Sequence, residues 1–181
     1  SNFDGVNWAD QRDNYVNGWL FPGGLTSTMT YANVVDKGGK VIDGFIANMG
    51  ANTVRLPINP ETVTQSWWSS YMGAIDVSLT KGMKVILCCW EGVNVKDGKI
   101  DDMTAFNAMW DVVIAQYGTN PNVYFEIFNE PFGYTQTQWA TICADWLNRY
   151  PALTRGNILV GGHGYDENVT LMGADTRFAN C

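Results

Sequence analysis

Acidic, amide and aromatic side chains recur in this sequence just after short apolar runs that have the composition of β-strands. In a parallel α/β barrel the carboxyl ends of the strands meet at one mouth, where active sites are built. This mixture of side chains suits a neutral polyhydroxylated substrate, because aromatic rings stack on sugar rings and acids handle the protons. The residues concerned are Asn7, Trp8, Arg55, Trp90, Glu91, Asn129, Glu130, His163 and Tyr165.

Two further observations concern the stretch from Val123 to Pro131, an apolar run bounded by turn residues that predicts a buried parallel strand. Side chains alternate along a strand, so Glu126, Phe128 and Glu130 are expected to share one face. Two carboxylates on one face of a buried strand are costly unless they are paired or used in chemistry. We predict that Glu126 is an ion-pair partner, with a chemical role as the alternative, and that Glu130 is the reactive acid.

Five strands alternate with helical patterns along the chain, as in right-handed βαβ units. The strands are predicted at residues 3–7, 53–56, 84–89, 123–131 and 158–161. Helices are predicted at residues 41–49, 68–79, 106–117 and 135–147, with a long polar loop before the first of them, through residue 39. Either an open doubly wound sheet or a (β/α)8 barrel fits this order. A barrel normally needs about 250 residues, so the 181 residues would supply five of its eight units.

Composition describes one globular α/β domain over residues 1–181, with 46% hydrophobic and 16% charged residues. The net charge of −7 argues against a nucleic-acid partner, which needs a basic face. No apolar stretch approaches the ~18 residues of a membrane span, and no signal peptide is recognisable, so the protein is either intracellular or in its mature form.

Cofactor motifs are missing from the sequence. No Gly-x-Gly-x-x-Gly follows a strand and no Gly-x-Ser-x-Gly elbow occurs, while a single histidine and the absence of Cys-x-x-Cys make a zinc site unexpected. We therefore expect neither a cofactor nor a metal. At least one of Cys88 and Cys89 is expected to be a buried thiol, and a disulfide to Cys143 or Cys181 stays open.

Three segments resemble the second, third and fourth strands of glycoside hydrolase family 5, the cellulase family of retaining (β/α)8 glycosidases. They are Asn52-Thr-Val-Arg-Leu-Pro57, Gly82-Met-Lys-Val-Ile-Leu87 and Phe125-Glu-Ile-Phe-Asn-Glu-Pro131. The resemblance implies that Glu130 is the general acid/base and that Asn129 donates a hydrogen bond to the sugar 2-hydroxyl. It also implies that Arg55 braces the carboxylate of the nucleophile.

The sequence departs from the family pattern at two places. The family usually places a histidine where Trp90 follows the third strand. Its nucleophile is a glutamate on a seventh strand, for which Glu91, Glu126 and Glu167 are poor substitutes, because retention needs two carboxyls about 5–5.5 Å apart. We therefore expect the chain to be a fragment that is inactive alone and ends as a sixth strand begins.

The leading function predicted from the sequence is a secreted, monomeric endo-acting β-glycanase that takes a polysaccharide or oligosaccharide substrate. β-1,4-Glucan is the leading substrate, ahead of mannan and xylan. A non-catalytic carbohydrate-binding or degenerate barrel is the alternative, and an unrelated doubly wound binding domain would leave Arg55 and Glu130 unexplained. Substrate contacts are predicted for Asn7, Trp8, Trp90, Glu91, His163 and Tyr165.

Two geometric expectations follow from this interpretation. Arg55 should lie within hydrogen-bonding reach of a carboxylate, because a buried guanidinium needs a partner. Trp8, Trp90 and Tyr165 should line one cleft with Glu130. Trp67 or Trp68 could join them, although core packing is the expected role of that pair.

Overall fold

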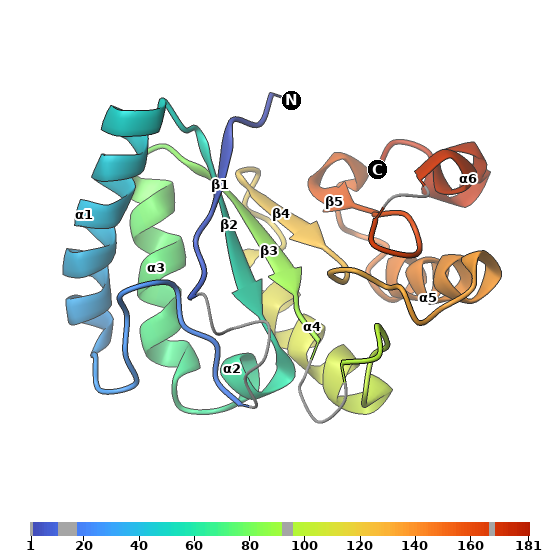
Figure 1. The fold of residues 1–181 in the computed structure, drawn as a ribbon, viewed down its shortest axis with the longest axis horizontal. Helices are drawn as coiled ribbons and strands as arrows, with labels where there is room; N and C mark the ends of the chain where they lie inside the picture. The colour runs from blue at the N-terminus through green and yellow to red at the C-terminus, as the bar shows by residue number, and fades with distance from the viewer. Residues whose placement is uncertain (1, 11–17, 92–95, 167–168) are drawn as a thin grey trace.

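The computed structural model describes residues 2–10, 18–91, 96–166 and 169–181, and these residues form a curved parallel sheet with helices along its outer side (Figure 1). The strands are β1 (Gly5–Asn7), β2 (Thr53–Ile58), β3 (Lys84–Cys89), β4 (Val123–Glu126) and β5 (Ile158–Leu159). The helices are α1 (Tyr31–Met49), α2 (Pro60–Thr64), α3 (Trp68–Thr80), α4 (Met103–Tyr117), α5 (Gln136–Arg149) and α6 (Val169–Ala174). Short 3₁₀ turns occupy Arg155–Asn157 and Thr176–Phe178.

Strand order decides between the two predicted architectures. Each strand pairs in parallel with the next one in sequence, in the order β1-β2-β3-β4-β5. A doubly wound sheet would reverse its order at a switch point, whereas a barrel adds each strand on the same side of the last. The arrangement is therefore that of the first part of a (β/α)8 barrel, as predicted.

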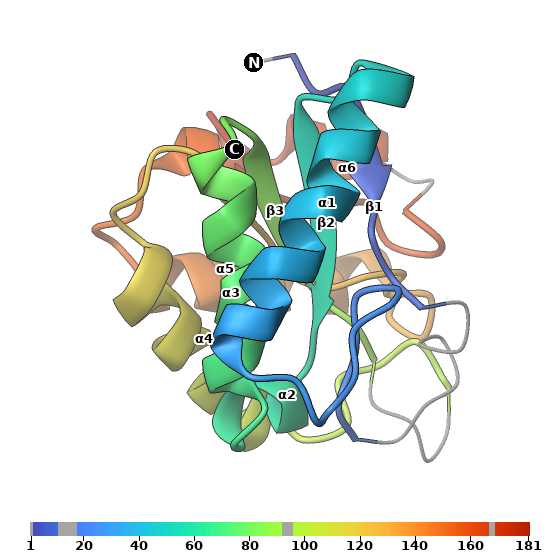
Figure 2. The ribbon, with the colours of Figure 1, turned by 90° about the vertical axis from the view of Figure 1, so that its left-hand side faces the viewer.

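The first helix begins ten residues earlier than the sequence pattern indicated, because part of the predicted loop is helical. Thr30 starts α1 with a capping box: its hydroxyl accepts from the Asn33 N–H, and the Asn33 side chain accepts from the Thr30 N–H. The glycines that suggested a loop are needed for close packing instead. A Cβ on Gly38 would lie 3.2 Å from the Trp8 ring and 3.3 Å from Val77 of α3. Figure 2 shows the resulting contact of α1 with α3.

Several strand bounds also differ from the prediction: β1 begins at Gly5 and β5 ends at Leu159, each two residues inside the predicted range. β2 continues through Pro57 to Ile58, since its pairing with β3 runs to Ile58 opposite Cys89. β4 ends at Glu126, five residues before the predicted end at Pro131, so the alternation of faces does not continue beyond Glu126. Phe128 consequently lies in the core with its ring centroid 6.3 Å from that of Trp139, and does not share the face of Glu126.

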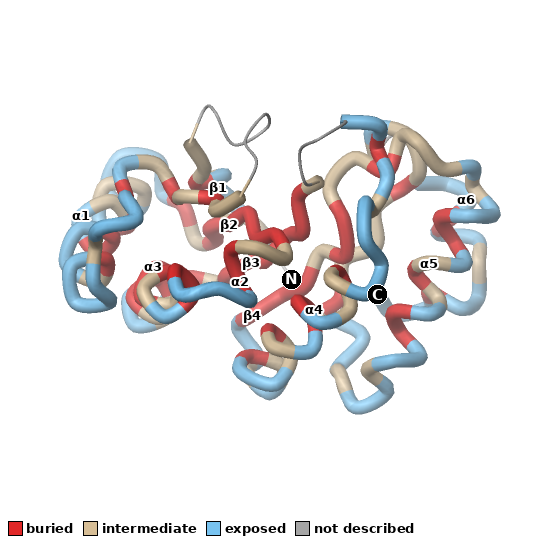
Figure 3. The backbone as a smooth tube through the Cα atoms, turned by 90° about the horizontal axis from the view of Figure 1, so that it is seen from below, coloured by how far each residue is buried: buried red, intermediate tan, exposed pale blue. Residues whose placement is uncertain are grey.

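The core lies between the sheet and the helices, where Figure 3 shows the buried stretches of the chain. Trp67 and Trp68 are 2% and 5% exposed, so both pack in this core. All four cysteines are free thiols, which removes the disulfide left open by the sequence. Among the described helices, none combines the length and apolar character that a bilayer span would require.

Candidate functional site

Arg55 stands in the middle of β2 and forms a bidentate ion pair with Glu126 of β4. Its Nε lies 2.7 Å from Glu126 Oε2, and its Nη2 lies 2.9 Å from Oε1. Both side chains are mostly buried, with 23% and 16% exposed. The predicted pairing of Arg55 with a carboxylate is confirmed, and Glu126 is the ion-pair partner that the sequence indicated.

Three other side chains accept hydrogen bonds from the same guanidinium. Asn129 Oδ1 lies 2.9 Å from Nη2, Asn7 Oδ1 lies 3.2 Å from Nη1, and Cys88 Sγ lies 3.1 Å from Nη2. Burial acts to lower the pKa of Arg55, but the adjacent Cys88 and Glu126 side chains outweigh it, so the pKa is raised overall. Arg55 is therefore a fixed cation that ties β1, β2, β3 and β4 together.

Asn129 is oriented by this contact. Because its amide oxygen accepts from Arg55, the amide nitrogen is left as a donor. Its backbone N–H donates to the Cys89 carbonyl at 2.8 Å, which fixes the segment after β4 against the end of β3. Asn129 thus presents a donor beside the next residue, Glu130.

Glu130 is held by its backbone, and its side chain is partly exposed. Its φ of 52° lies in the left-handed region, which is uncommon for a residue other than glycine. The side chain is 38% exposed, and Glu130 Oε2 lies 3.9 Å from Lys96 Nζ. The Glu130 N–H donates to Asp166 Oδ2 at 3.4 Å.

Asp166 is a member of the site that the sequence prediction missed. Burial raises its pKa to about 6, and the Glu126 carboxylate adds to this rise. Its Oδ1 would lie 2.4 Å from a Cβ added to Gly161, so a side chain there would displace the carboxylate. The glycine-rich turn from Gly161 to Gly164, just before Asp166, is the one sequence signal that could have pointed to this carboxylate.

The predicted aromatic residues occupy three different environments. Trp90 is 6% exposed, and the Arg55 Cζ lies 5.9 Å from its ring centroid, so the structure brings Trp90 to the site. Tyr165 is 59% exposed and stacks on Phe132 with centroids 4.7 Å apart, just beyond Glu130. Trp8 is 3% exposed and donates to the Gly23 carbonyl, so the structure places its ring in the core and not in a cleft.

The remaining predicted residues lie on neighbouring loops. Glu91 accepts from the Asp97 and Gly98 N–H groups at 2.6 and 3.0 Å, and burial raises its pKa while these hydrogen bonds oppose the rise. Its carboxylate lies within 4.8 Å of those of Asp97 and Asp101, yet it is already satisfied by backbone donors. His163 is partly buried in the turn that leads from β5 to Asp166.

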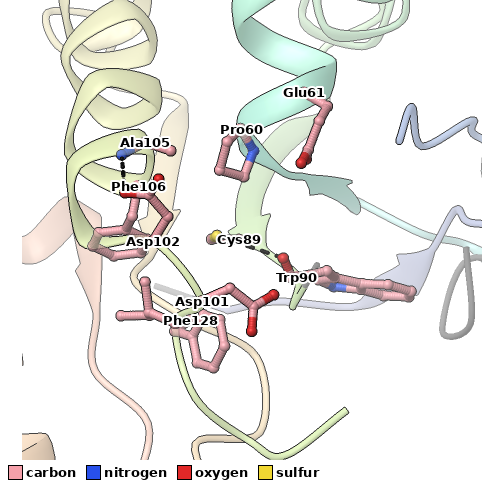
Figure 4. A pocket seen from close by; sticks show the side chains of 10 residues that line it. Pro60, Glu61, Cys89, Trp90, Asp101, Asp102, Ala105, Phe106 and Phe128 are labelled. Carbon is pink, nitrogen blue, oxygen red and sulfur yellow. Dashed lines mark hydrogen bonds between the residues drawn. The ribbon is translucent and has the colours of Figure 1, made fainter. Parts of the chain in front are cut away.

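A small pocket of about 130 Å³ adjoins the site between α2 and α4 (Figure 4). It takes acidic groups from Glu61 and Asp101, and Trp90 separates it from Arg55. Burial raises the pKa of Asp101, and nearby Asp97 and Glu61 add to that rise. The pocket lining is Pro60, Glu61, Cys89, Trp90, Ile100, Asp101, Asp102, Ala105, Phe106 and Phe128.

The fold and the site together define the first part of a parallel (β/α)8 barrel, with a cluster of arginine, amide and carboxylate side chains that extends to the carboxyl ends of its strands. The family description "Cellulase (glycosyl hydrolase family 5)" matches residues 20–175, and the chain belongs to that family. No curated protein sequence matches significantly.

Several solved structures share the fold. An endo-β-1,4-glucanase from Xanthomonas axonopodis pv. citri superposes with a TM-score of 0.63 at 18% identity, over 92% of this chain and 54% of that one. Cel5A (EG2) from Hypocrea jecorina gives 0.60 at 17% identity, over 90% and 55%. The Thermobifida fusca endoglucanase Cel5A (E5) in complex with cellotetraose gives 0.57 at 17% identity, over 88% and 56%. The chain spans about half the length of these structures.

Proposed function

We propose that these residues form the acid/base half of the active site of a retaining endo-β-1,4-glucanase. One observation carries the proposal: in a family 5 chain, the Asn129-Glu130 pair follows β4 beside a buried arginine, and Glu130 keeps a carboxylate that is not committed to that arginine. The fixed charge and the available acid thus belong to different carboxylates, Glu126 and Glu130.

The proposed reaction has two displacement steps. Glu130 protonates the leaving glycosidic oxygen while a glutamate of a seventh strand, implied by the family resemblance, attacks the anomeric carbon. Glu130 then removes a proton from the water that hydrolyses the glycosyl-enzyme. The Asn129 amide nitrogen, turned outward by the contact with Arg55, donates to the 2-hydroxyl of the sugar.

The acids within the chain are poorly suited to act as the nucleophile. Glu126 is engaged by Arg55 through both oxygens, and Glu91 by two backbone N–H groups. Glu167 lies outside the described residues. The proposal therefore takes the nucleophile from elsewhere in a closed barrel, and residues 1–181 alone should not hydrolyse substrate.

The proposed substrate is β-1,4-glucan, with mannan and xylan as weaker candidates. The Tyr165–Phe132 stack supplies exposed aromatic surface beside the segment that carries Glu130, since Tyr165 is 59% exposed, and aromatic rings bind the apolar faces of sugars. Two of the structures with this fold hold cello-oligosaccharides, cellopentaose and cellotetraose.

Product stereochemistry tests the proposed reaction. The closed barrel is incubated with cellopentaose, and the anomeric protons of fresh products are followed by NMR before mutarotation. The expected first product is the β-anomer, whereas an α-anomer would contradict the double displacement. Binding of cellopentaose without any cleavage would favour the alternative, a non-catalytic carbohydrate-binding barrel. An Asp145→Asn protein, changed at an exposed acid of α5, should match the wild type.

A further inference from the structure

Two residues with left-handed backbones meet beside the proposed active site. Among the described residues, the non-glycine positions with positive φ are Glu130 at 52°, Asp166 at 63° and Asn180 at 70°. Such conformations are unfavourable for residues other than glycine and persist where the surrounding structure enforces them. The first two are joined by a hydrogen bond although 36 residues separate them in sequence.

The contact between them is built from both sides. Asp166 Oδ2 accepts from the Glu130 N–H at 3.4 Å, which is long for such a bond. The other oxygen, Oδ1, is buried and has no hydrogen-bond partner among the described residues. Gly161 leaves room for this oxygen, since a Cβ at that position would lie 2.4 Å from it and displace the carboxylate. The Asp166 carboxylate therefore packs against the backbone of Gly161 and accepts a hydrogen bond from the backbone of Glu130.

Charged and titratable groups surround Asp166 on several elements. Glu126 of β4 and Glu130 after β4 are the acidic neighbours, Arg55 of β2 is the basic one, and Cys143 of α5 lies on the helix side. Burial and Glu126 raise the pKa of Asp166 to about 6, while the Glu130 N–H and Arg55 act in the opposite direction. Its carboxyl group accordingly changes charge in the mildly acidic range.

We propose that Asp166 is a positioning residue for Glu130. Its carboxylate holds the Glu130 N–H and so maintains the left-handed backbone that directs the Glu130 side chain away from the Arg55 cluster. An ionised carboxylate accepts a stronger hydrogen bond than a neutral carboxyl, so the hydrogen bond from the Glu130 N–H strengthens when Asp166 loses its proton. Any effect of Asp166 on catalysis rests on the proposed role of Glu130, whereas the hydrogen bond between Asp166 and the Glu130 N–H does not.

The test follows the Glu130 amide in the ¹⁵N-labelled 181-residue protein by NMR from pH 4.5 to pH 8. In the wild type, the Glu130 N–H resonance should shift with a midpoint near pH 6. Asp166→Asn keeps the shape and one acceptor oxygen but has no proton to lose, so this transition should disappear. Asp145→Asn makes the same chemical change at an exposed site and should keep it.

Amide exchange provides a second measurement. The Glu130 N–H should exchange faster with solvent in Asp166→Ala, which has no acceptor, than in Asp166→Asn. A pH transition that survives in Asp166→Asn, or equal exchange in both variants, would overturn the proposal. Neither measurement involves hydrolysis, so a failure of the positioning proposal is distinguishable from a failure of the proposed glucanase function.

Discussion

Arg55 and Glu130 lie at the same mouth of the sheet, yet their side chains are held in contrasting ways. The Arg55 guanidinium donates to Glu126, Asn129, Asn7 and Cys88 at distances between 2.7 and 3.2 Å. The Glu130 carboxylate lies 3.9 Å from Lys96 and is 38% exposed, and its backbone is tied by one long hydrogen bond.

This contrast distinguishes a carboxylate that stabilises the fold, Glu126, from one that can take part in the reaction, Glu130. A mostly buried, bidentate ion pair is expensive to break, and its ionised carboxylate has no proton to give. An acid that keeps its carboxylate free of such partners can exchange its proton with a substrate. Glu126 therefore pairs with Arg55 and fixes its position, while the Glu130 carboxylate remains available for proton transfer.

The largest effect should come from breaking the Arg55 side. Glu126→Gln leaves a buried guanidinium without its counter-charge, and we expect the free energy of unfolding to fall by about 3–5 kcal/mol. Urea unfolding of the 181-residue protein measures it. Asp111→Asn is the matched control: it removes the carboxylate partner of Arg149 in a pair whose side chains are 46% and 43% exposed. That change should cost less than about 1 kcal/mol, and equal losses would contradict the contrast.

An intermediate loss of stability is expected at the contact between Gly161 and Asp166. In Gly161→Ala the new Cβ would lie 2.4 Å from Asp166 Oδ1, so the carboxylate must move, at a cost of about 1–3 kcal/mol. Gly156→Ala places a methyl group where nothing lies within 4 Å. If thermal unfolding shows the same change for both variants, the close apposition of Gly161 and Asp166 is refuted.

The smallest change in stability should come from Glu130 itself. Among the described residues, the cation paired with the Glu130 carboxylate is Lys96, at 3.9 Å. Glu130→Gln should therefore change the free energy of unfolding by no more than about 0.5 kcal/mol. Urea unfolding beside Glu126→Gln makes the comparison direct. A loss as large as that of Glu126→Gln would show that Glu130 is a structural ion-pair member.

Sequence reasoning predicted the parts of this site that depend on local pattern. Strand and helix periodicity placed Arg55 and Glu126 within reach of each other, because both lie inside regular strands whose side-chain direction is determined by alternation. The helix predicted at residues 135–147 likewise corresponds to α5, which begins after a capping box formed by Thr135 and Gln138.

The features missed by the sequence depend on contacts between distant segments. Asp166 reaches Glu130 only through two left-handed backbones, and neither conformation is encoded by residue type as it would be for glycine. Trp8 was expected in a cleft because it follows a strand, but Gly38 admits its ring to the core. Gly38 also contributed to the prediction of a loop through residue 39, where the structure has the first half of α1.

The acid/base role of Glu130 is tested most directly by how the effect of Glu130→Gln depends on the leaving group. In the closed barrel, hydrolysis of cellopentaose, whose leaving group needs a proton, should fall by ~10²–10⁴. Cleavage of an activated aryl cellobioside should keep a nearly unchanged first step, accumulate the glycosyl-enzyme, and recover turnover when azide is added. Equal losses on both substrates, with no recovery in azide, would contradict the assignment of Glu130 as the general acid/base.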